Sequence, residues 1–301
     1  MIHRAILATD LSKCSDLLME CIPEFKILGI SHITLLHVPT ISFNYMEYSG
    51  YSMMVHIEAR MINMKNKLIQ NGIAADFIFR EGLPSQEILD YAANHPEALL
   101  IIGSKGHGFH KRNLIGSTTL RVIQYSKNPV LMIRIKNLGK DAAGEHHCSL
   151  ESKKITGYGI ILTDFSRHAS GAFFYARDYL AEHMDQIAIM HVQDKIVMRH
   201  HDPATIERFN KIDSERLRNC SMSLRRKTKA PVQTVLVEGA VVPEIIREVK
   251  EDAATLLIMG THGKGYFSDI VLGSTTSAVV QLVEANCLLV PTPGEETEQE
   301  D

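Results

Sequence analysis

One motif occurs twice in this 301-residue chain, and its duplication constrains the fold more than any other feature of the sequence. The pattern Gly-x2-Gly-x9-Gly-Ser begins at Gly103 and again at Gly260. Each copy follows an apolar run, at 98–102 or 255–259, and each leads into a Ser/Thr cluster. Two copies in register indicate a strand, a phosphate-binding loop and a helix N-terminus, all of them duplicated.

The duplication extends over the rest of the chain. Residues 6–12 resemble residues 160–166, and residues 35–38 resemble residues 189–192, with a separation of 154 positions in both cases. The glycine motifs are 157 positions apart. A period this long indicates a duplicated domain and excludes a solenoid of short repeats.

The alignment of the halves predicts the domain boundaries. Residues 137–154 have the composition of a linker. We therefore expect one domain at 1–136 and a second at 155–293. The remaining segment, 294–301, is mostly acidic and is expected to be disordered.

Each half alternates short apolar runs with helical patterns. In the first half, the expected strands are a run ending at 9–10, followed by 33–38, 75–79, 98–102 and 129–133. The expected helices are one capped by Ser12 and running through Phe25, one at 57–70 after a loop at 39–56, one starting at Pro84, and one at 117–125. This alternation predicts an α/β fold with a parallel sheet that helices cover on both faces.

Composition narrows the functional classes. The apolar content of 45%, the charged content of 22% and the net charge of −3 fit a soluble globular protein without a nucleic-acid surface. No apolar run reaches the roughly 18–20 residues of a membrane helix, and the N-terminus lacks the layout of a signal peptide. Five scattered cysteines without a CxxC motif favour reduced thiols and a cytoplasmic location.

Ligands of open parallel sheets bind at the carboxyl ends of the strands. This rule places three features at the carboxyl-terminal edge of the sheet in each half, which we call the rim. They are the aspartate after the first strand, the His-Val pair at the end of the second strand and the glycine loop. Exposed N–H groups and the helix dipole at Ser117 and Ser274 favour an anion there. We therefore predict phosphate binding in at least one half.

Each of these features also has a structural explanation that the sequence leaves open. Gly-Ser-Thr-Thr is a good helix N-cap without any ligand, and an aspartate after a strand often caps the next helix. Lys105 and His262, at the same loop position, could face phosphate or simply be solvated. The histidines His37 and His191 are expected to be packing or rim residues and not catalytic bases.

No catalytic set or metal site is predicted. The chain has no Gly-x4-Gly-Lys-(Ser/Thr) motif, which excludes a P-loop NTPase. The clusters at 146–148 and 200–202 contain histidines, but adjacent ligands on flexible segments bind metal poorly unless the two clusters meet.

The duplicated glycine motif, the Thr-Asp after the first strand and the His-Val after the second resemble the universal stress protein family in its tandem, ATP-binding form. The resemblance covers residues 1–135 and 155–293. It implies two tandem five-stranded parallel sheets of strand order 3-2-1-4-5, similar to nucleotide α-hydrolases, that pair through their last strands as a pseudo-twofold intramolecular dimer. The proline that the family often has before Thr-Asp is Ala8 here, and Leu162 in the second half.

The resemblance also implies a set of nucleotide-binding residues. Asp10 and Asp164 would lie near adenine and ribose, and the backbone of Val38 and Val192 would bind adenine. The remaining candidates line the adenine pocket or hold ribose and phosphates: Ile102, Gly103, Lys105, Gly106, Gly116, Ser117 and Thr118, with Met259, Gly260, His262, Gly263, Gly273, Ser274 and Thr275 in the second half.

The function expected from the resemblance is a nucleotide-responsive binding protein of the stress response. Its ligand would be ATP or AMP, with Mg²⁺ accompanying ATP, and its partners would be an unidentified protein and a further copy of the chain, but neither nucleic acid nor membrane. Nucleotide binding would order the loops at 106–116 and 263–273. Two alternatives stay open: a slow ATPase or nucleotide hydrolase, and a dimeric scaffold that binds no nucleotide.

Overall fold

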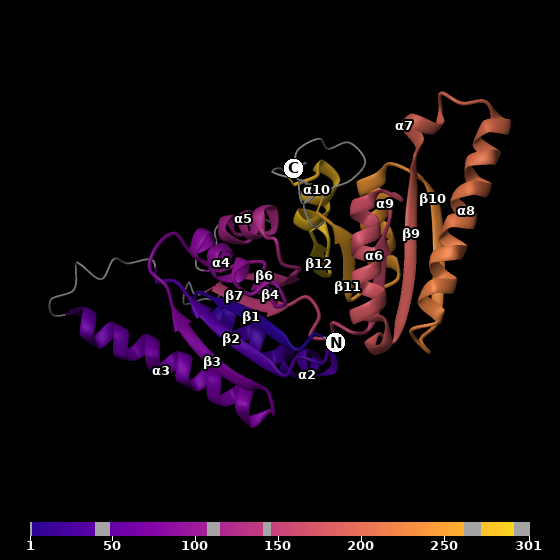
Figure 1. Cartoon of the computed structure of the whole chain (residues 1–301). Coiled ribbons are helices and arrows are strands. Elements are labelled where there is room, and N and C mark those ends of the chain that lie inside the picture. Colours follow the sequence, from indigo (N-terminus) through magenta and orange to yellow (C-terminus); the bar gives the residue numbers. More distant parts are fainter. Residues whose placement is uncertain (1, 40–48, 107–114, 141–145, 262–271, 292–301) are drawn as a thin grey trace, which may run out of the picture.

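The structure is a computed structural model that describes residues 2–39, 49–106, 115–140, 146–261 and 272–291 (Figure 1). The first half contains β1 (Arg4–Thr9), α1 (Lys13–Asp16), η1 (Leu17–Cys21), α2 (Ile22–Ile27), β2 (His32–His37), α3 (Ser49–Gln70), β3 (Ala74–Phe79), α4 (Pro84–Ala93), β4 (Leu99–Gly103), α5 (Ser117–Tyr125) and β5 (Val130–Ile133). A hairpin, β6 (Ile135–Lys140) and β7 (His146–Leu150), follows. The second half contains β8 (Tyr158–Leu162), α6 (Arg167–Tyr179), η3 (Ala181–His183), β9 (Gln186–Asp194), α7 (Lys195–Met198), α8 (Pro203–Arg225), β10 (Val232–Gly239), α9 (Val241–Glu251), β11 (Leu256–Gly260), α10 (Ser274–Leu282) and β12 (Asn286–Val290).

Both halves contribute to one ten-stranded sheet with the order β10-β9-β8-β11-β12-β5-β4-β1-β2-β3. Figure 1 shows its two halves lying side by side, with the first half in indigo to magenta and the second in pink through orange to yellow. Within each half all the strand pairs are parallel. The predicted order 3-2-1-4-5 is therefore confirmed in both halves.

The halves join through their last strands, as predicted. β5 and β12 pair antiparallel, with Leu131 opposite Leu288. These two leucines are 157 positions apart, so each is the counterpart of the other in the repeat. When two equivalent residues face each other, a twofold axis passes between them. The pseudo-twofold axis of the chain therefore passes between Leu131 and Leu288.

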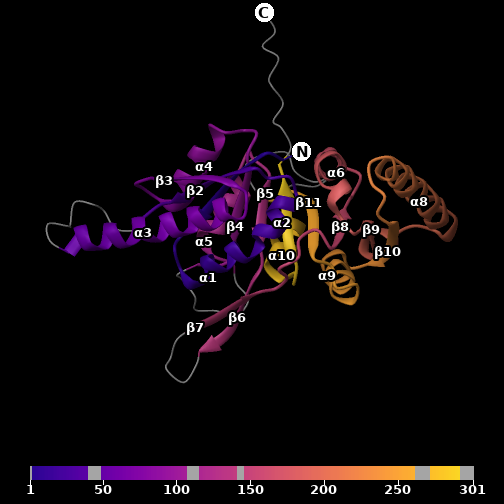
Figure 2. The same ribbon diagram turned by 90° about the horizontal axis from the view of Figure 1, so that it is seen from below.

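Helices cover both faces of the sheet (Figure 2). The buried cluster on one face includes side chains of α1–α3, α6 and α8, and the cluster on the other face includes side chains of α4, α5, α9 and α10. Because both faces are covered, β4, β5, β8, β11 and β12 are buried along their whole length. Each cluster contains residues of both halves, so the two halves share their cores across the junction.

Two helices differ from the predictions. The predicted helix that Ser12 caps is broken into α1, η1 and α2, because Pro23 lacks an N–H and its ring clashes with the preceding helical turn. Its counterpart α6 has no proline and is continuous. The helix predicted at 57–70 begins at Ser49 instead. The loop-like composition of residues 49–56 misled the prediction, although Met53 and Met54 are good helix formers.

The segment predicted as a linker, 137–154, contains most of the hairpin β6–β7, which begins at Ile135. Figure 2 shows this hairpin projecting from the layers of the sheet. Local composition did not reveal it, because its base is fixed by contacts that are distant in sequence. The amide of Ile135 donates to Oγ of Ser104 at 2.9 Å, and Ile135 and Leu150 are buried. Within the described ranges, no helix combines the length and apolarity needed to cross a bilayer.

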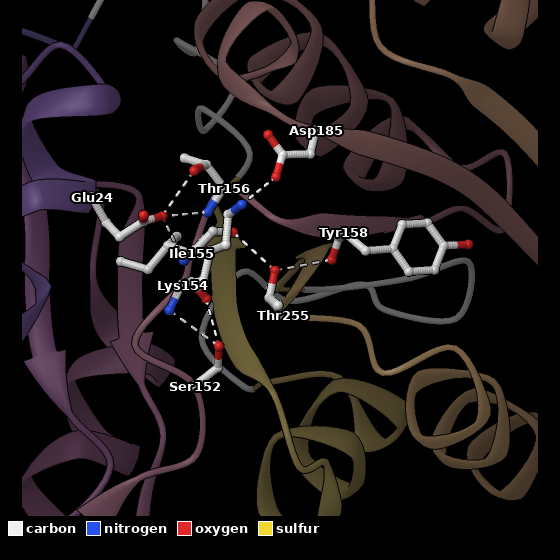
Figure 3. A network of polar contacts seen from close by, with 8 residues as sticks. All are labelled: Glu24, Ser152, Lys154, Ile155, Thr156, Tyr158, Asp185 and Thr255. Atoms are coloured by element: carbon white, nitrogen blue, oxygen red, sulfur yellow. Dashed lines mark hydrogen bonds and ion pairs between the residues drawn. The ribbon is translucent and has the colours of Figure 1, made fainter.

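A polar network attaches the start of the second half to the first half (Figure 3). Oε2 of Glu24 in α2 accepts hydrogen bonds from the amides of Ile155 and Thr156, at 2.7 and 2.8 Å, and from the Thr156 hydroxyl at 2.8 Å. Such charge-assisted hydrogen bonds are stronger than neutral ones. This one carboxylate therefore fixes the entry into β8.

Candidate functional site

The turn after the first strand has the same geometry in both halves. In the first half, Oγ1 of Thr9 accepts from the amide of Leu11 at 3.1 Å and Oδ1 of Asp10 accepts from the amide of Ser12 at 3.0 Å. The equivalent distances in the second half, from Thr163 to Phe165 and from Asp164 to Ser166, are 3.0 and 2.9 Å. Leu11 and Phe165 both have positive φ, at 58° and 60°.

The two rim histidines support these turns. Nδ1 of His37 lies 2.8 Å from the carbonyl of Thr9, and Nδ1 of His191 lies 2.7 Å from the carbonyl of Thr163. Since a carbonyl only accepts, each ring donates from Nδ1. Both histidines are buried, and these bonds hold the end of the first strand in position.

Hydrogen bonds close the base of both glycine loops. The hydroxyl of Thr119 donates to the carbonyl of Gly103 at 2.8 Å, and the amide of Gly116 donates to the carbonyl of Ser104 at 2.9 Å. In the second half, the bonds from Thr276 to Gly260 and from Gly273 to Thr261 measure 3.1 and 3.0 Å. The segments between, 107–114 and 262–271, lie outside the described residues, and with them lie His262 and Gly263.

The aspartate of the first rim contacts the glycine loop. A Cβ atom at Gly106 would lie 2.1 Å from Oδ2 of Asp10, which no real side chain tolerates. The structure therefore brings together two predicted site residues that are far apart in the sequence. Glycine at position 106 lets the loop backbone approach the carboxylate.

The helices that begin on the rim are of two kinds. Those after the first strand, α1 and α6, have serine caps, with Ser12 and Ser166 accepting from an amide of the first turn. The helices after the glycine loops, α5 and α10, have Gly116 and Gly273 as N-caps, and no side chain caps them. A helix start without a side-chain cap presents its amides to an anion.

The candidates at these helix starts are positioned alike. Ser117 and Ser274 are exposed, and Thr118 and Thr275 are half-buried. The adenine-pocket candidates Ile102 and Met259 are buried in the cluster that α5 and α10 cover.

The backbone of Val38 and Val192 points toward the first strand of its half. The carbonyl of His37 accepts from Arg80, beyond β3, and the carbonyl of Met190 accepts from Thr163, beyond β8. Successive peptide groups of a strand point to opposite sides, so the groups of Val38 and Val192 point to the side where β1 and β8 have ended. That orientation suits a flat base lying at the rim.

Lys105 is buried, with 7% of its surface exposed, and is therefore not the solvated loop residue that the sequence left open. Burial is the main cause that lowers the pKa of Lys105, and the positive charge of Arg134 is the second. The thiols of Cys14 and Cys148 act in the opposite direction.

One pair of rim residues was missed by the sequence analysis. Arg60 of α3 donates to the carbonyl of Leu11 and pairs with Asp16 at 2.6 Å. Arg216 of α8 lies 5.2 Å from the ring centroid of Phe165. Both arginines therefore reach the positive-φ residue after the first strand. They are 156 positions apart, between the two separations of the repeat, and that spacing could have identified them.

The second rim carries a polar cluster that the first rim lacks among the described residues. Asp213 of α8 accepts from Gln193 at 2.9 Å and lies 3.6 Å from Nε2 of His191. Arg216 pairs with the other oxygen of Asp213 at 3.4 Å. The rims are thus alike at the loop and different beside the second strand.

Sequence comparison assigns the chain to a family. The model of the "Universal stress protein family" matches residues 1–134 and again residues 158–291. The chain belongs to the universal stress protein family, in a tandem form. Its similarity to single relatives supports the duplication, because 46% of the chain aligns with 98% of universal stress protein MJ0577 of Methanocaldococcus jannaschii, at 27% identity. Universal stress protein YxiE of Bacillus subtilis is 36% identical over 24% of the chain, a match that spans only 49% of YxiE.

Solved structures support the same fold. A universal stress protein from Archaeoglobus fulgidus aligns over 97% of this chain and 99% of its own, with a TM-score of 0.68 and 22% identity. Another, also from Archaeoglobus fulgidus and solved in complex with dAMP, covers 44% of this chain and 98% of its own, at 16% identity and a TM-score of 0.33. A likeness that weak assigns no ligand to the present chain.

Proposed function

We propose that this universal stress protein binds adenine nucleotides, ATP or AMP, at one or both rims and acts in the cytoplasm as a nucleotide-responsive binding protein of the stress response. The observation that carries the proposal is the duplicated rim. Each half combines an aspartate turn, a glycine loop closed at its base and a helix start without a side-chain cap.

The rim residues suit each part of a nucleotide. The backbone of Val38 or Val192 would bind the adenine edge, and Asp10 or Asp164 would accept from ribose hydroxyls. The amides at the starts of α5 and α10 would donate to phosphate oxygens. Each charge-assisted hydrogen bond contributes about 1.5–3 kcal/mol. Three or four of them account for the roughly 8 kcal/mol of a micromolar ligand.

The direct test is to denature freshly purified full-length protein and identify the released small molecules by chromatography and mass spectrometry. We expect an adenine nucleotide. If the protein releases no nucleotide and also fails to bind added ATP, the scaffold that binds no nucleotide becomes the better account. The same preparation tests the enzymatic alternative, because turnover of ATP faster than about 1 per second is in the range of ordinary enzymes.

A further inference from the structure

Two cysteines from distant segments meet beside the first rim. Cys14 lies in α1, directly after the turn that contains Asp10, and Cys148 lies in β7 of the hairpin. Cys14 belongs to a buried cluster, and Cys148 packs against that cluster. Helix α1 and strand β7 are in contact. Burial, and then a hydrogen bond with the Cys148 thiol, raise the pKa of Cys14 to about 12. The contact between the two elements and this hydrogen bond place the two thiols side by side.

The hairpin holds Cys148 in this place. Its base is buried at Ile135 and Leu150, and the Ile135 amide bonds to Ser104 of the first rim. Across the hairpin, Nζ of Lys136 pairs with Oε1 of Glu151 at 2.5 Å. Because both strands of the hairpin are fixed at its base, the fold itself holds Cys148 near α1.

Lys105 is buried and directly follows Ser104, the residue that bonds to the base of the hairpin. Lys105 interacts with Cys14 and Cys148, and each of these thiols favours the charged form of the lysine. In return, the ammonium group favours the thiolate of Cys14 against the effect of burial. A lysine next to cysteines is a common environment of thiols that exchange and oxidise.

The arrangement is specific to the first half. The repeat places His168 at the position of Cys14, 154 residues later. The other cysteines also differ, because the causes that raise the pKa values of Cys21, Cys220 and Cys287 include no second thiol. Cys21 and Cys287 are fully buried.

We propose that Cys14 and Cys148 are a redox modification site, at which a hydroperoxide forms a reversible disulfide that fastens the hairpin to α1 on the first rim. Cys148 is half-buried and reacts first. Its thiolate attacks one oxygen of hydrogen peroxide and the O–O bond breaks. This gives a sulfenic acid and a hydroxide, which takes up the proton released by the thiol and becomes one water. The sulfur of Cys14 then attacks the sulfenic sulfur, the S–S bond forms, and the hydroxyl leaves with the thiol proton as a second water.

This step balances without a further reactant. The two thiols lose two electrons and two protons, and the peroxide is reduced to two waters. An external thiol reverses the reaction by exchange. The disulfide would join α1, next to the turn of Asp10, to the hairpin, whose Ile135 amide bonds to Ser104. Its formation does not depend on nucleotide binding.

The test uses the full-length protein, reduced, desalted and treated with hydrogen peroxide. Trypsin then releases Cys14 and Cys21 together in residues 14–26, and Cys148 in residues 141–153. We expect these two peptides to be cross-linked through Cys14 and Cys148, the accessible thiols of the unfolded protein to fall from five to three, and dithiothreitol to restore all of them.

Three variants assign the bond. Cys14→Ala and Cys148→Ala should each abolish the cross-link. Cys21→Ala is the matched control, because it removes the other cysteine of the same tryptic peptide and should leave the cross-link unchanged. The proposal is overturned if the bond maps to Cys21, if it joins two chains, or if Cys148 proceeds to sulfinic acid while Cys14 stays free. The cross-linked peptides of the oxidised wild-type protein identify the bond even if a variant folds poorly.

Discussion

The two halves of the chain agree closely at the rim and differ around it. The bonds that close the glycine loops, the aspartate turns and the rim histidines have distances that agree between the halves within 0.3 Å. By contrast, the segment α1–η1–α2 corresponds to the single helix α6. Duplication has thus kept the backbone geometry of the rim while the surrounding elements have diverged.

The halves also diverge at their junction. Arg134 is buried and donates to the carbonyls of Val280 and Gln281 at the end of α10, at 3.0 and 2.9 Å. Its counterpart in the repeat is Pro291, which has no such donor. Among the residues that the structure describes, a hairpin likewise follows only the first half. The pseudo-twofold symmetry of the strands therefore does not extend to the side chains that hold the junction.

The largest expected effect on nucleotide affinity comes from adding a side chain at Gly106 of the first rim. Gly106→Ala would place Cβ 2.1 Å from Oδ2 of Asp10, so the loop or the carboxylate must move. We expect nucleotide affinity at the first rim to fall about a hundredfold, or ~2.7 kcal/mol, as measured by calorimetry on full-length protein.

The control for that substitution lies outside both rims. At Gly171 in α6, a Cβ atom would meet no neighbouring side chain or loop within 4 Å. Gly171→Ala should therefore bind as the wild type does. Equal losses in both variants would mean that the contact between Asp10 and Gly106 does not shape a binding site.

The next effect compares equivalent carboxylates of the two halves. Glu24→Ala removes three hydrogen bonds to Ile155 and Thr156, and we expect a loss of about 2–3 kcal/mol in the free energy of unfolding. The counterpart, Asp178, is exposed and pairs with its half-buried neighbour Arg177, and Asp178→Ala should cost less than about 1 kcal/mol. Denaturant unfolding measures both, and a larger loss for Asp178→Ala would contradict the role given to Glu24.

The junction gives a third comparison. Arg134→Met keeps the buried stem but leaves the carbonyls of Val280 and Gln281 without their donor. We expect about 1–2 kcal/mol of destabilisation. Pro291→Ala is the control at the equivalent position and should change stability little. An unchanged unfolding midpoint for Arg134→Met would show that the strands alone hold the junction.

The smallest effect concerns the rim arginines. Arg216→Leu removes a cation–π contact with Phe165 and an ion pair with Asp213, with an expected cost of about 0.5–1 kcal/mol. Arg60→Leu, which removes the bond to the Leu11 carbonyl, should act on the first half in the same way. Thermal unfolding of the two variants shows whether Arg60 and Arg216 contribute equally to stability. A variant more stable than the wild type would contradict the stabilising role given to these arginines.

The sequence predicted the features that repeat or that local patterns encode. The helix at Ser117–Tyr125 has the predicted bounds, and the apolar spacing of Ile57, Met61, Met64 and Leu68 marks the buried face of α3. Both depend on periodicity and capping within one segment.

The features that escaped prediction depend on contacts distant in sequence. Nothing near Lys105 indicates that it is buried, and nothing near residues 135–150 indicates that Ser104 fixes a hairpin there. Arg134 likewise stabilises a helix that begins 140 positions later. Tertiary packing determines these features, and the local pattern does not encode it.

The central claim is that the rims bind adenine nucleotide. Equilibrium dialysis of the nucleotide-free, full-length protein against labelled ATP tests it most directly. We predict saturable binding that AMP competes for, with one nucleotide per occupied rim. Binding at the first rim should be lost in Gly106→Ala but retained in Gly171→Ala. Binding that stays linear and unsaturated up to millimolar ATP in the folded protein would contradict the claim.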